Sequence, residues 1–157
     1  MKKISLKLLG LVAIAGLLVS SFLLPGCATL GPPFQKIEKI PDNMGLVYIY
    51  RPSKLMGGAI KYEVDANKIL VTHLPAGGYY PYFAKPGVTE FSAETESKSA
   101  VTIDVKAGET YYIKGTIGIG FFVGRPHLVI VSREEGAKEI AECKIIPEET
   151  AKGTSKK

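Results

Sequence analysis

Histidines and scattered carboxylates are the side chains of this sequence that could ligate a metal ion or transfer a proton. The chain holds two histidines, His73 and His127, which lie far apart and outside HxxxH or CxxC spacing. A metal site needs several ligands brought together. We therefore predict no metal site and no cofactor, and we expect both histidines at strand ends.

Nucleophilic catalysis needs a serine or cysteine that is activated by a base and an orienting group. The GxSxG pattern is absent, and the serines lie among turn and strand residues without a nearby histidine. Glu94 and Glu96 could be a pair of carboxylates of the kind that glycosidases use. Beside Lys98 on one face of a strand, they are more simply a solvated charged edge. We predict that the protein is not an enzyme and has no catalytic residue.

The first 26 residues have the layout of an export signal. Three lysines precede residues 8–24 (LLGLVAIAGLLVSSFLL), which are apolar apart from two serines, and a proline and a glycine follow. This order is typical of a secretory signal peptide. The apolar run nearly reaches the length of a membrane-spanning helix, so a retained anchor is one alternative and a free secreted product is another.

Leu24, Pro25, Gly26 and Cys27 resemble the lipobox of bacterial lipoproteins, in which a leucine lies three positions before an invariant cysteine and a small residue lies directly before it. Pro25 departs from that pattern. The resemblance implies cleavage between Gly26 and Cys27 and a covalent diacylglyceryl group on the Cys27 sulfur. Ala28, where some lipoproteins have aspartate, implies transfer to the outer membrane, with the protein facing the periplasm.

Cys143 would then be a lone thiol in an oxidising compartment, where leftover cysteines tend to pair or react. It falls at the edge of the apolar face of a short helix that we predict within residues 134–146. We predict a half-buried structural residue. An intermolecular disulfide or a redox role is the alternative, and no CxxC motif supports the redox role.

The basic charge of the chain belongs mainly to the export signal. The 20 basic and 15 acidic residues give a formal net charge of +5, but Lys2, Lys3 and Lys7 precede the cleavage site. The rest of the chain has 17 basic and 15 acidic residues, a net charge of +2, without a basic stripe. This distribution excludes nucleic acid as a partner.

Three regions follow the signal peptide. Residues 27–43 contain Gly-Pro-Pro and a further proline, which predicts a lipidated N-terminus and a flexible tether. Such a tether could hold a domain about 50 Å from the lipid. The strand-like pattern of residues 44–146 predicts one β-rich domain. The polar composition of residues 147–157 predicts a disordered tail.

Short apolar and aromatic runs alternate with turn residues throughout residues 44–146. They cover residues 46–51, 60–64, 68–74, 79–84, 89–95, 100–105, 110–117 and 127–132. This spacing predicts a mostly β fold, an antiparallel β-sandwich of seven or eight strands that is Ig-like or prealbumin-like. Within residues 134–146 the spacing of the apolar residues changes from that of a strand to that of a helix. This change predicts one short C-terminal helix.

Three motifs in this order resemble those of small bacterial lipoproteins that carry an uncharacterised β-rich domain of unknown function. They are Tyr-Arg-Pro at 50–52, Ala-Gly-Glu-Thr-Tyr-Tyr at 107–112 and Phe-Phe-Val-Gly-Arg-Pro at 121–126. The resemblance covers nearly all of residues 46–146. It implies a β-rich module that faces the periplasm, and it brings no known catalytic residue.

A glycine-rich apolar stretch between residues 115 and 124 is the best candidate for an interaction surface. It lacks the third glycine and the following helix of a dinucleotide loop. Its glycines permit a bulge or the close approach of another backbone. We assign the candidate surface to Ile119, Phe121, Phe122 and Arg125. Packing of this stretch in the core is the alternative.

These observations predict a non-catalytic, membrane-anchored lipoprotein of the bacterial envelope that presents its sandwich to another envelope protein. The alternative is a binding module for peptidoglycan or a small apolar ligand. It rests on the apolar stretch and on tyrosines such as Tyr79, Tyr82 and Tyr112, whose rings could stack on sugars. Adjacent residues of a strand point to opposite sides, so only about half of these rings can share a surface.

Overall fold

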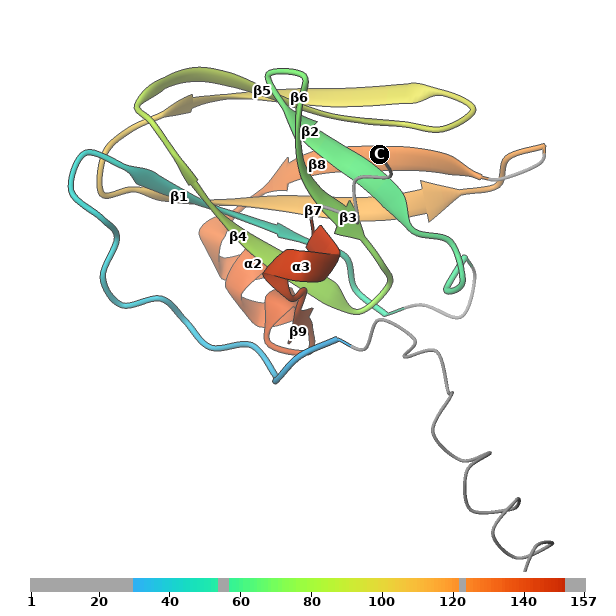
Figure 1. Cartoon of the computed structure of the whole chain (residues 1–157), viewed down its shortest axis with the longest axis horizontal. Coiled ribbons are helices and arrows are strands. Elements are labelled where there is room, and N and C mark those ends of the chain that lie inside the picture. Colours follow the sequence, from blue (N-terminus) through green and yellow to red (C-terminus); the bar gives the residue numbers. More distant parts are fainter. Residues whose placement is uncertain (1–29, 54–56, 122–123, 152–157) are drawn as a thin grey trace, which may run out of the picture.

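The computed structural model describes residues 30–53, 57–121 and 124–151. The predicted signal peptide and Cys27 lie outside these residues. The described elements run in the following order (Figure 1): β1 (Gly45–Tyr50), β2 (Tyr62–Ala66), β3 (Ile69–Leu74), β4 (Gly78–Ala84), β5 (Gly87–Glu94), β6 (Lys98–Val105), β7 (Thr110–Gly118), β8 (Arg125–Val131), α2 (Arg133–Ile140), β9 (Lys144–Ile145) and α3 (Glu148–Ala151).

The strands form two sheets, which confirms the predicted mostly β sandwich. The first sheet has the order β8-β7-β1-β4-β9, and the second has the order β3-β2-β5-β6. Each of the eight predicted apolar runs overlaps one strand, and the two-residue β9 is additional. Most pairs are antiparallel, but β1–β7 and β4–β9 are parallel. Turn signals mark where strands end, whereas a parallel pair needs a long crossover that no local signal reveals.

The central strand β1 is buried along its whole length. Val47 and Ile49 point between the two sheets, where they join the main core. Tyr48 and Tyr50 point to the other side, where they join a second apolar cluster. Since both faces of β1 are apolar, the outer face of the first sheet needs a cover of its own.

Residues 30–43, here called the N-terminal arm, provide part of that cover. The arm lies on the same side of β1 as α2 (Figure 1), and Phe34, Ile37 and Ile40 pack on the second cluster. Gly31 and Phe34 donate backbone hydrogen bonds of 2.8 and 2.9 Å to the segment around β9. Residues 30–43 are therefore not the flexible tether that their prolines predict.

The arm turns one residue in three toward the sheet. Gly31, Phe34, Ile37 and Ile40 are each partly buried, and the residues between them are exposed. A period of three is that of a polyproline II helix, which makes no internal hydrogen bonds. Prolines therefore exclude a regular helix or strand here without excluding a docked, extended segment.

Helix α2 completes the cover and confirms the predicted C-terminal helix. The Ser132 side chain caps its first turn by accepting a hydrogen bond of 3.1 Å from the Glu135 N–H. Gly136 lies so close to the ring of Tyr112 that a side chain there would overlap it. A glycine weakens an isolated helix, but here it allows close packing on β7.

The predicted disordered tail is wrong for its first residues. Glu148–Ala151 form the single helical turn α3, and Ala151 is fully buried against the core. An alanine in a polar sequence gives no periodic signal, so tertiary packing decides its place. Residues 152–157 lie outside the described residues.

Replacing Phe34 tests whether the arm belongs to the folded body. The Phe34 ring meets Tyr48 and Tyr79 edge-on, with centroid distances of 5.4 and 5.1 Å. We expect Phe34→Ala to lower the free energy of unfolding by about 2 kcal/mol, because a half-buried ring loses less than a fully buried one. Urea unfolding of the purified protein measures the change.

Lys36→Ala is the matched control for this substitution, because Lys36 lies in the same arm and is exposed. It should change stability by less than about 0.5 kcal/mol. Hydrogen exchange at the Gly31 and Phe34 amides should accelerate in the Phe34 variant only. Equal stability of all three proteins would show that the arm contributes nothing to the fold.

Candidate functional site

The loop between β7 and β8 carries the most exposed large apolar side chains of the described chain. Ile119 is 82% exposed and Phe121 is 83% exposed. We call these two residues the apolar tip. They are two of the four residues predicted as an interaction surface, and the alternative of core packing is wrong for both.

The neighbouring β5–β6 turn holds this loop in place. The carboxylate of Glu96 accepts a hydrogen bond of 2.7 Å from the Phe121 backbone N–H. Arg125 Nε lies 4.0 Å from the same carboxylate. The Thr95 hydroxyl donates a bond of 2.6 Å to the Gly124 carbonyl oxygen. Both turns lie at the same end of the sandwich (Figure 1), so one supports the other.

Two glycines allow the loop to close on itself. A side chain at Gly120 would overlap the backbone of Gly124, and Gly124 has a φ of +100°. The expected close approach of two backbones is therefore found within this loop. The remaining member of the predicted surface, Phe122, lies outside the described residues.

The structure changes the interpretation of Glu96. The sequence favours a solvated charged edge, but the Glu96 side chain is only 17% exposed and bonds to the backbone of the loop. No sequence signal links it to Phe121, because the two residues meet only through the packing of two hairpins. Arg125 keeps a side chain that is 60% exposed, so the tip is apolar with one cationic neighbour.

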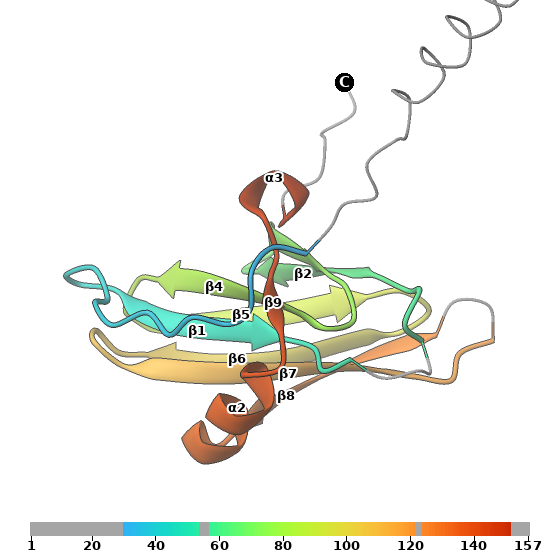
Figure 2. The same ribbon diagram turned by 90° about the horizontal axis from the view of Figure 1, so that it is seen from below.

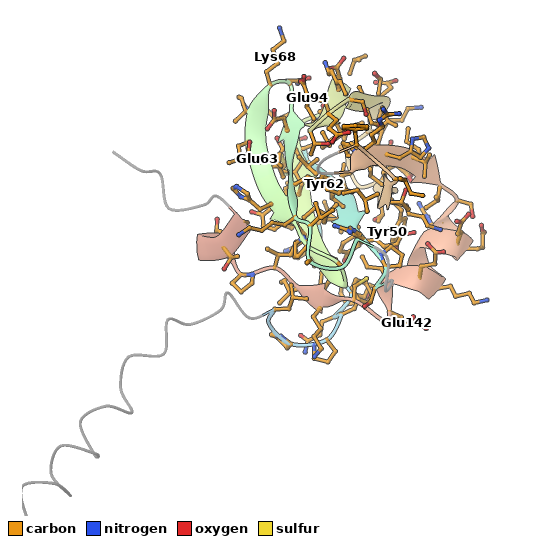
Figure 3. All side chains as sticks on the ribbon, turned by 90° about the vertical axis from the view of Figure 1, so that its right-hand side faces the viewer. Tyr50, Tyr62, Glu63, Lys68, Glu94 and Glu142 are labelled. Atoms are coloured by element: carbon orange, nitrogen blue, oxygen red, sulfur yellow. The ribbon has the colours of Figure 1, made fainter. Side chains whose placement is uncertain are left out.

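A second group of reactive side chains lies between α2 and the first sheet. The Tyr50 hydroxyl donates a hydrogen bond of 2.7 Å to Glu139, whose other oxygen accepts one of 2.6 Å from Lys114 Nζ. Lys114 also bonds to Glu135 at 3.2 Å. Figure 3 labels Tyr50 in the interior of the body. These contacts fasten α2 across β1 and β7.

The protonation states in this group do not suit acid–base catalysis at neutral pH. The hydrogen bond to Glu139 raises the pKa of Lys114, which keeps the amine charged. Burial, together with Glu139, raises the pKa of Tyr50 well above its usual range, which keeps the phenol protonated. A general acid or base works best with a pKa near the working pH. The arrangement is a structural clamp between a helix and a sheet.

Cys143 lies beside this clamp and is fully buried, so the prediction of a half-buried residue is wrong. Its sulfur is 3.7 Å from the Arg51 carbonyl oxygen. Burial raises the pKa of the Cys143 thiol to about 11. A thiol becomes nucleophilic by ionising, so this environment suppresses both disulfide formation and nucleophilic attack. The arm packs over it, which the sequence does not reveal.

Arg51, the arginine of the Tyr-Arg-Pro motif, is a buried cation, which the motif alone does not reveal. Its guanidinium donates hydrogen bonds of 2.6 and 2.7 Å to the carbonyl oxygens of Ile60 and Gly57, and it lies 5.4 Å from the centre of the Tyr62 ring. Burial lowers the pKa of Arg51. These contacts tie the end of β1 to residues 57–62 at the start of β2, so the arginine of the Tyr-Arg-Pro motif has a structural role.

The two histidines lie on different sheets. His73, in β3, makes contacts of 3.0 Å to the Ala151 carbonyl oxygen and 3.1 Å to Glu63. His127 is exposed on β8. Within the described ranges, no group of three histidine, cysteine, aspartate or glutamate side chains could hold a metal ion.

The tyrosine side chains give little support to a sugar platform. Tyr79 and Tyr112 are buried in the second apolar cluster, where the arm and α2 cover them. A shallow groove of about 290 Å³ remains beside β4, lined by apolar residues that include Tyr80, Phe83 and Ile145. Phe83 is 37% exposed there. The groove lacks the buried polar groups that usually fix the orientation of a ligand.

Together, these observations define a small, mostly β module of two packed sheets. The chain belongs to the family described as "Protein of unknown function (DUF2846)", which matches residues 41–125. The predicted resemblance to an uncharacterised domain family is confirmed at that level.

An uncharacterized protein of Haemophilus influenzae (strain ATCC 51907 / DSM 11121 / KW20 / Rd) is similar along most of its length. It is 32% identical over 142 residues, which cover 83% of this chain and 82% of that protein. No solved structure matches the chain significantly. Among the described residues, no helix is long and apolar enough to cross a membrane.

The raised pKa of Cys143 predicts a loss of stability in alkali. The unfolded thiol ionises near its ordinary pKa of 9.0, whereas the folded thiol stays protonated up to about 11. Below pH 9 both states bind the proton. Above it only the folded state does, so the free energy of unfolding falls as the pH rises, by on the order of 2 kcal/mol in total.

Denaturant unfolding between pH 8 and pH 11 measures this slope. Cys143→Ala should keep only the part of the slope that buried tyrosines contribute. In a Cys27→Ser background, a thiol reagent at pH 8 should label Cys143 only after denaturation. Rapid labelling of the native protein would contradict the assignment of a closed, neutral thiol.

Proposed function

We propose that the protein is a non-catalytic lipoprotein of the bacterial envelope, anchored through Cys27, that binds another envelope protein through its apolar tip. The exposure of Ile119 and Phe121 on a braced loop carries the binding part of the proposal. The lipobox resemblance at Leu24–Cys27 supports the anchor. The outer membrane, facing the periplasm, is the proposed location.

The energetics of the loop support a binding role. Exposed apolar side chains do not stabilise the isolated fold, because apolar side chains stabilise a protein when they are buried. Yet Glu96 and Thr95 bond to the backbone of Phe121 and Gly124. A backbone that is already held by hydrogen bonds loses less conformational entropy when a partner covers it. The exposed side chains of Ile119 and Phe121 are therefore suited to recognition.

The described reactive groups support a role without catalysis. Cys143 is closed off from solvent. Tyr50 and Lys114 both donate hydrogen bonds to the carboxylate of Glu139. A catalytic set needs groups that meet a substrate in an accessible cleft. A binding protein has no such requirement, and each buried side-chain nitrogen or oxygen of the described residues has a hydrogen-bond partner.

Replacing Cys27 tests the lipid anchor. Cells that are grown with an alkyne-labelled fatty acid should incorporate the label into the wild-type protein, and Cys27→Ala should lose essentially all of it. Cys143→Ala is the matched control and should keep the label. Equal label in wild type and Cys27→Ala, or label in neither, would reject lipid attachment at this residue.

Photo-crosslinking tests the apolar tip. A photoreactive phenylalanine at position 121 should give one discrete crosslinked product in cells, which mass spectrometry identifies. Position 69 is the control, because Ile69 is an exposed apolar residue of β3 that is 72% exposed. Glu96→Ala should weaken the product from position 121, since it removes the acceptor of the Phe121 N–H. The same products from both positions would contradict a specific surface.

A further inference from the structure

The docked N-terminal arm leaves very little chain between the proposed lipid and the body. Only Ala28 and Thr29 separate Cys27 from Leu30, the first described residue. At about 3.5 Å per residue, this link spans at most about 10 Å. A freely flexible chain as far as residue 43 would have reached several times that distance.

The point where this link joins the body is fixed. The Gly31 N–H donates a hydrogen bond of 2.8 Å to the Ile145 carbonyl oxygen, and the Ile145 N–H donates one of 3.0 Å to Pro32. Leu30 packs against the main core. Its side chain and Ser53 both lie close to Gly77. The proposed lipid anchor is therefore attached to the sandwich at one defined position.

The other end of the described chain lies on the same side. Figures 2 and 3 show α3 and the start of the arm on one side of the body, with α2 on the opposite side. Ala151 is fully buried there, and its carbonyl oxygen accepts a hydrogen bond of 3.0 Å from His73. Both chain ends are thus held at one face by packing as well as by hydrogen bonds.

The charge of the remaining residues adds an independent observation. Residues 152–157 (KGTSKK) contain three lysines and no acidic residue. In the sequence they follow Ala151, which is buried at the face where the lipid would attach. Basic segments near a membrane surface are attracted to anionic headgroups, and a lipid together with a basic segment is a common pair of membrane signals.

We infer that the face bearing Leu30, Ser53 and α3 rests against the phospholipid surface that holds the Cys27 lipid, with the lysines of residues 152–157 on its anionic headgroups. The occupant of this face is the membrane itself. Helix α2 then points away from the membrane. The inference rests on the proposed lipid anchor and adds the orientation and the distance of the body.

Fluorescence quenching by the lipid surface tests the orientation. The full lipidated chain carries a fluorophore at Ser53→Cys or, as the matched control, at Glu134→Cys in α2. Both positions are exposed, and Cys143 stays unlabelled because it is buried. On vesicles that contain a nitroxide-headgroup lipid, we expect quenching at position 53 to exceed quenching at position 134 several-fold.

Lengthening the link tests the distance. A flexible Gly/Ser insertion of about 16 residues after Thr29 should reduce quenching at position 53 to the level at position 134. An insertion without effect, or equal quenching at both positions in the original chain, overturns the inference. Flotation with the vesicles is measured in the same sample. If the protein does not float, the lipid anchor fails, whereas flotation with equal quenching rejects only the orientation.

The fluorophore at position 53 also tests whether the lysines of residues 152–157 bind anionic headgroups. Quenching at position 53 should be stronger on vesicles of phosphatidylcholine with phosphatidylglycerol than on phosphatidylcholine alone. Replacement of Lys152, Lys156 and Lys157 by glutamine should remove that difference. A difference that persists in the triple variant would overturn the role of the lysines in holding this face.

Discussion

The burial of β1 on both faces is the constraint on which the rest of the structure depends. Its valine and isoleucine fill the space between the sheets, and Tyr48 and Tyr50 fill the opposite side. Tyr48 stacks on Tyr112 at 5.4 Å, and its hydroxyl accepts a 2.8 Å bond from the Ile37 N–H. Each aromatic pair contributes about 1 kcal/mol beyond burial, but only if water stays out.

This requirement recruits parts of the chain that are distant in the sequence. The N-terminal arm and α2 cover the tyrosines, and β9 joins the two covers because Phe34 bonds to Cys143 and Gly31 bonds to Ile145. The family match at residues 41–125 includes β1 to β7 but omits most of the arm and all of α2. The domain that folds is therefore longer than the segment that identifies it.

The sequence predicts the strands well because their ends carry explicit turn residues. It fails where a feature depends on contacts between distant segments. Prolines at 32 and 33 correctly exclude regular structure, yet the three-residue spacing of Phe34, Ile37 and Ile40 is the signal of docking. The exposure of Ile119 and Phe121 agrees with the interaction surface that the sequence suggests, whereas the contact with Glu96 depends on how two hairpins pack.

The distribution of chemical groups connects the fold to the proposed role. Cys143 and Tyr50 are turned inward, and their surroundings keep both protonated. The apolar tip is turned outward at one end of the sandwich. With the proposed lipid anchor, this body would be held at one face and would present Ile119 and Phe121 to a partner at its end.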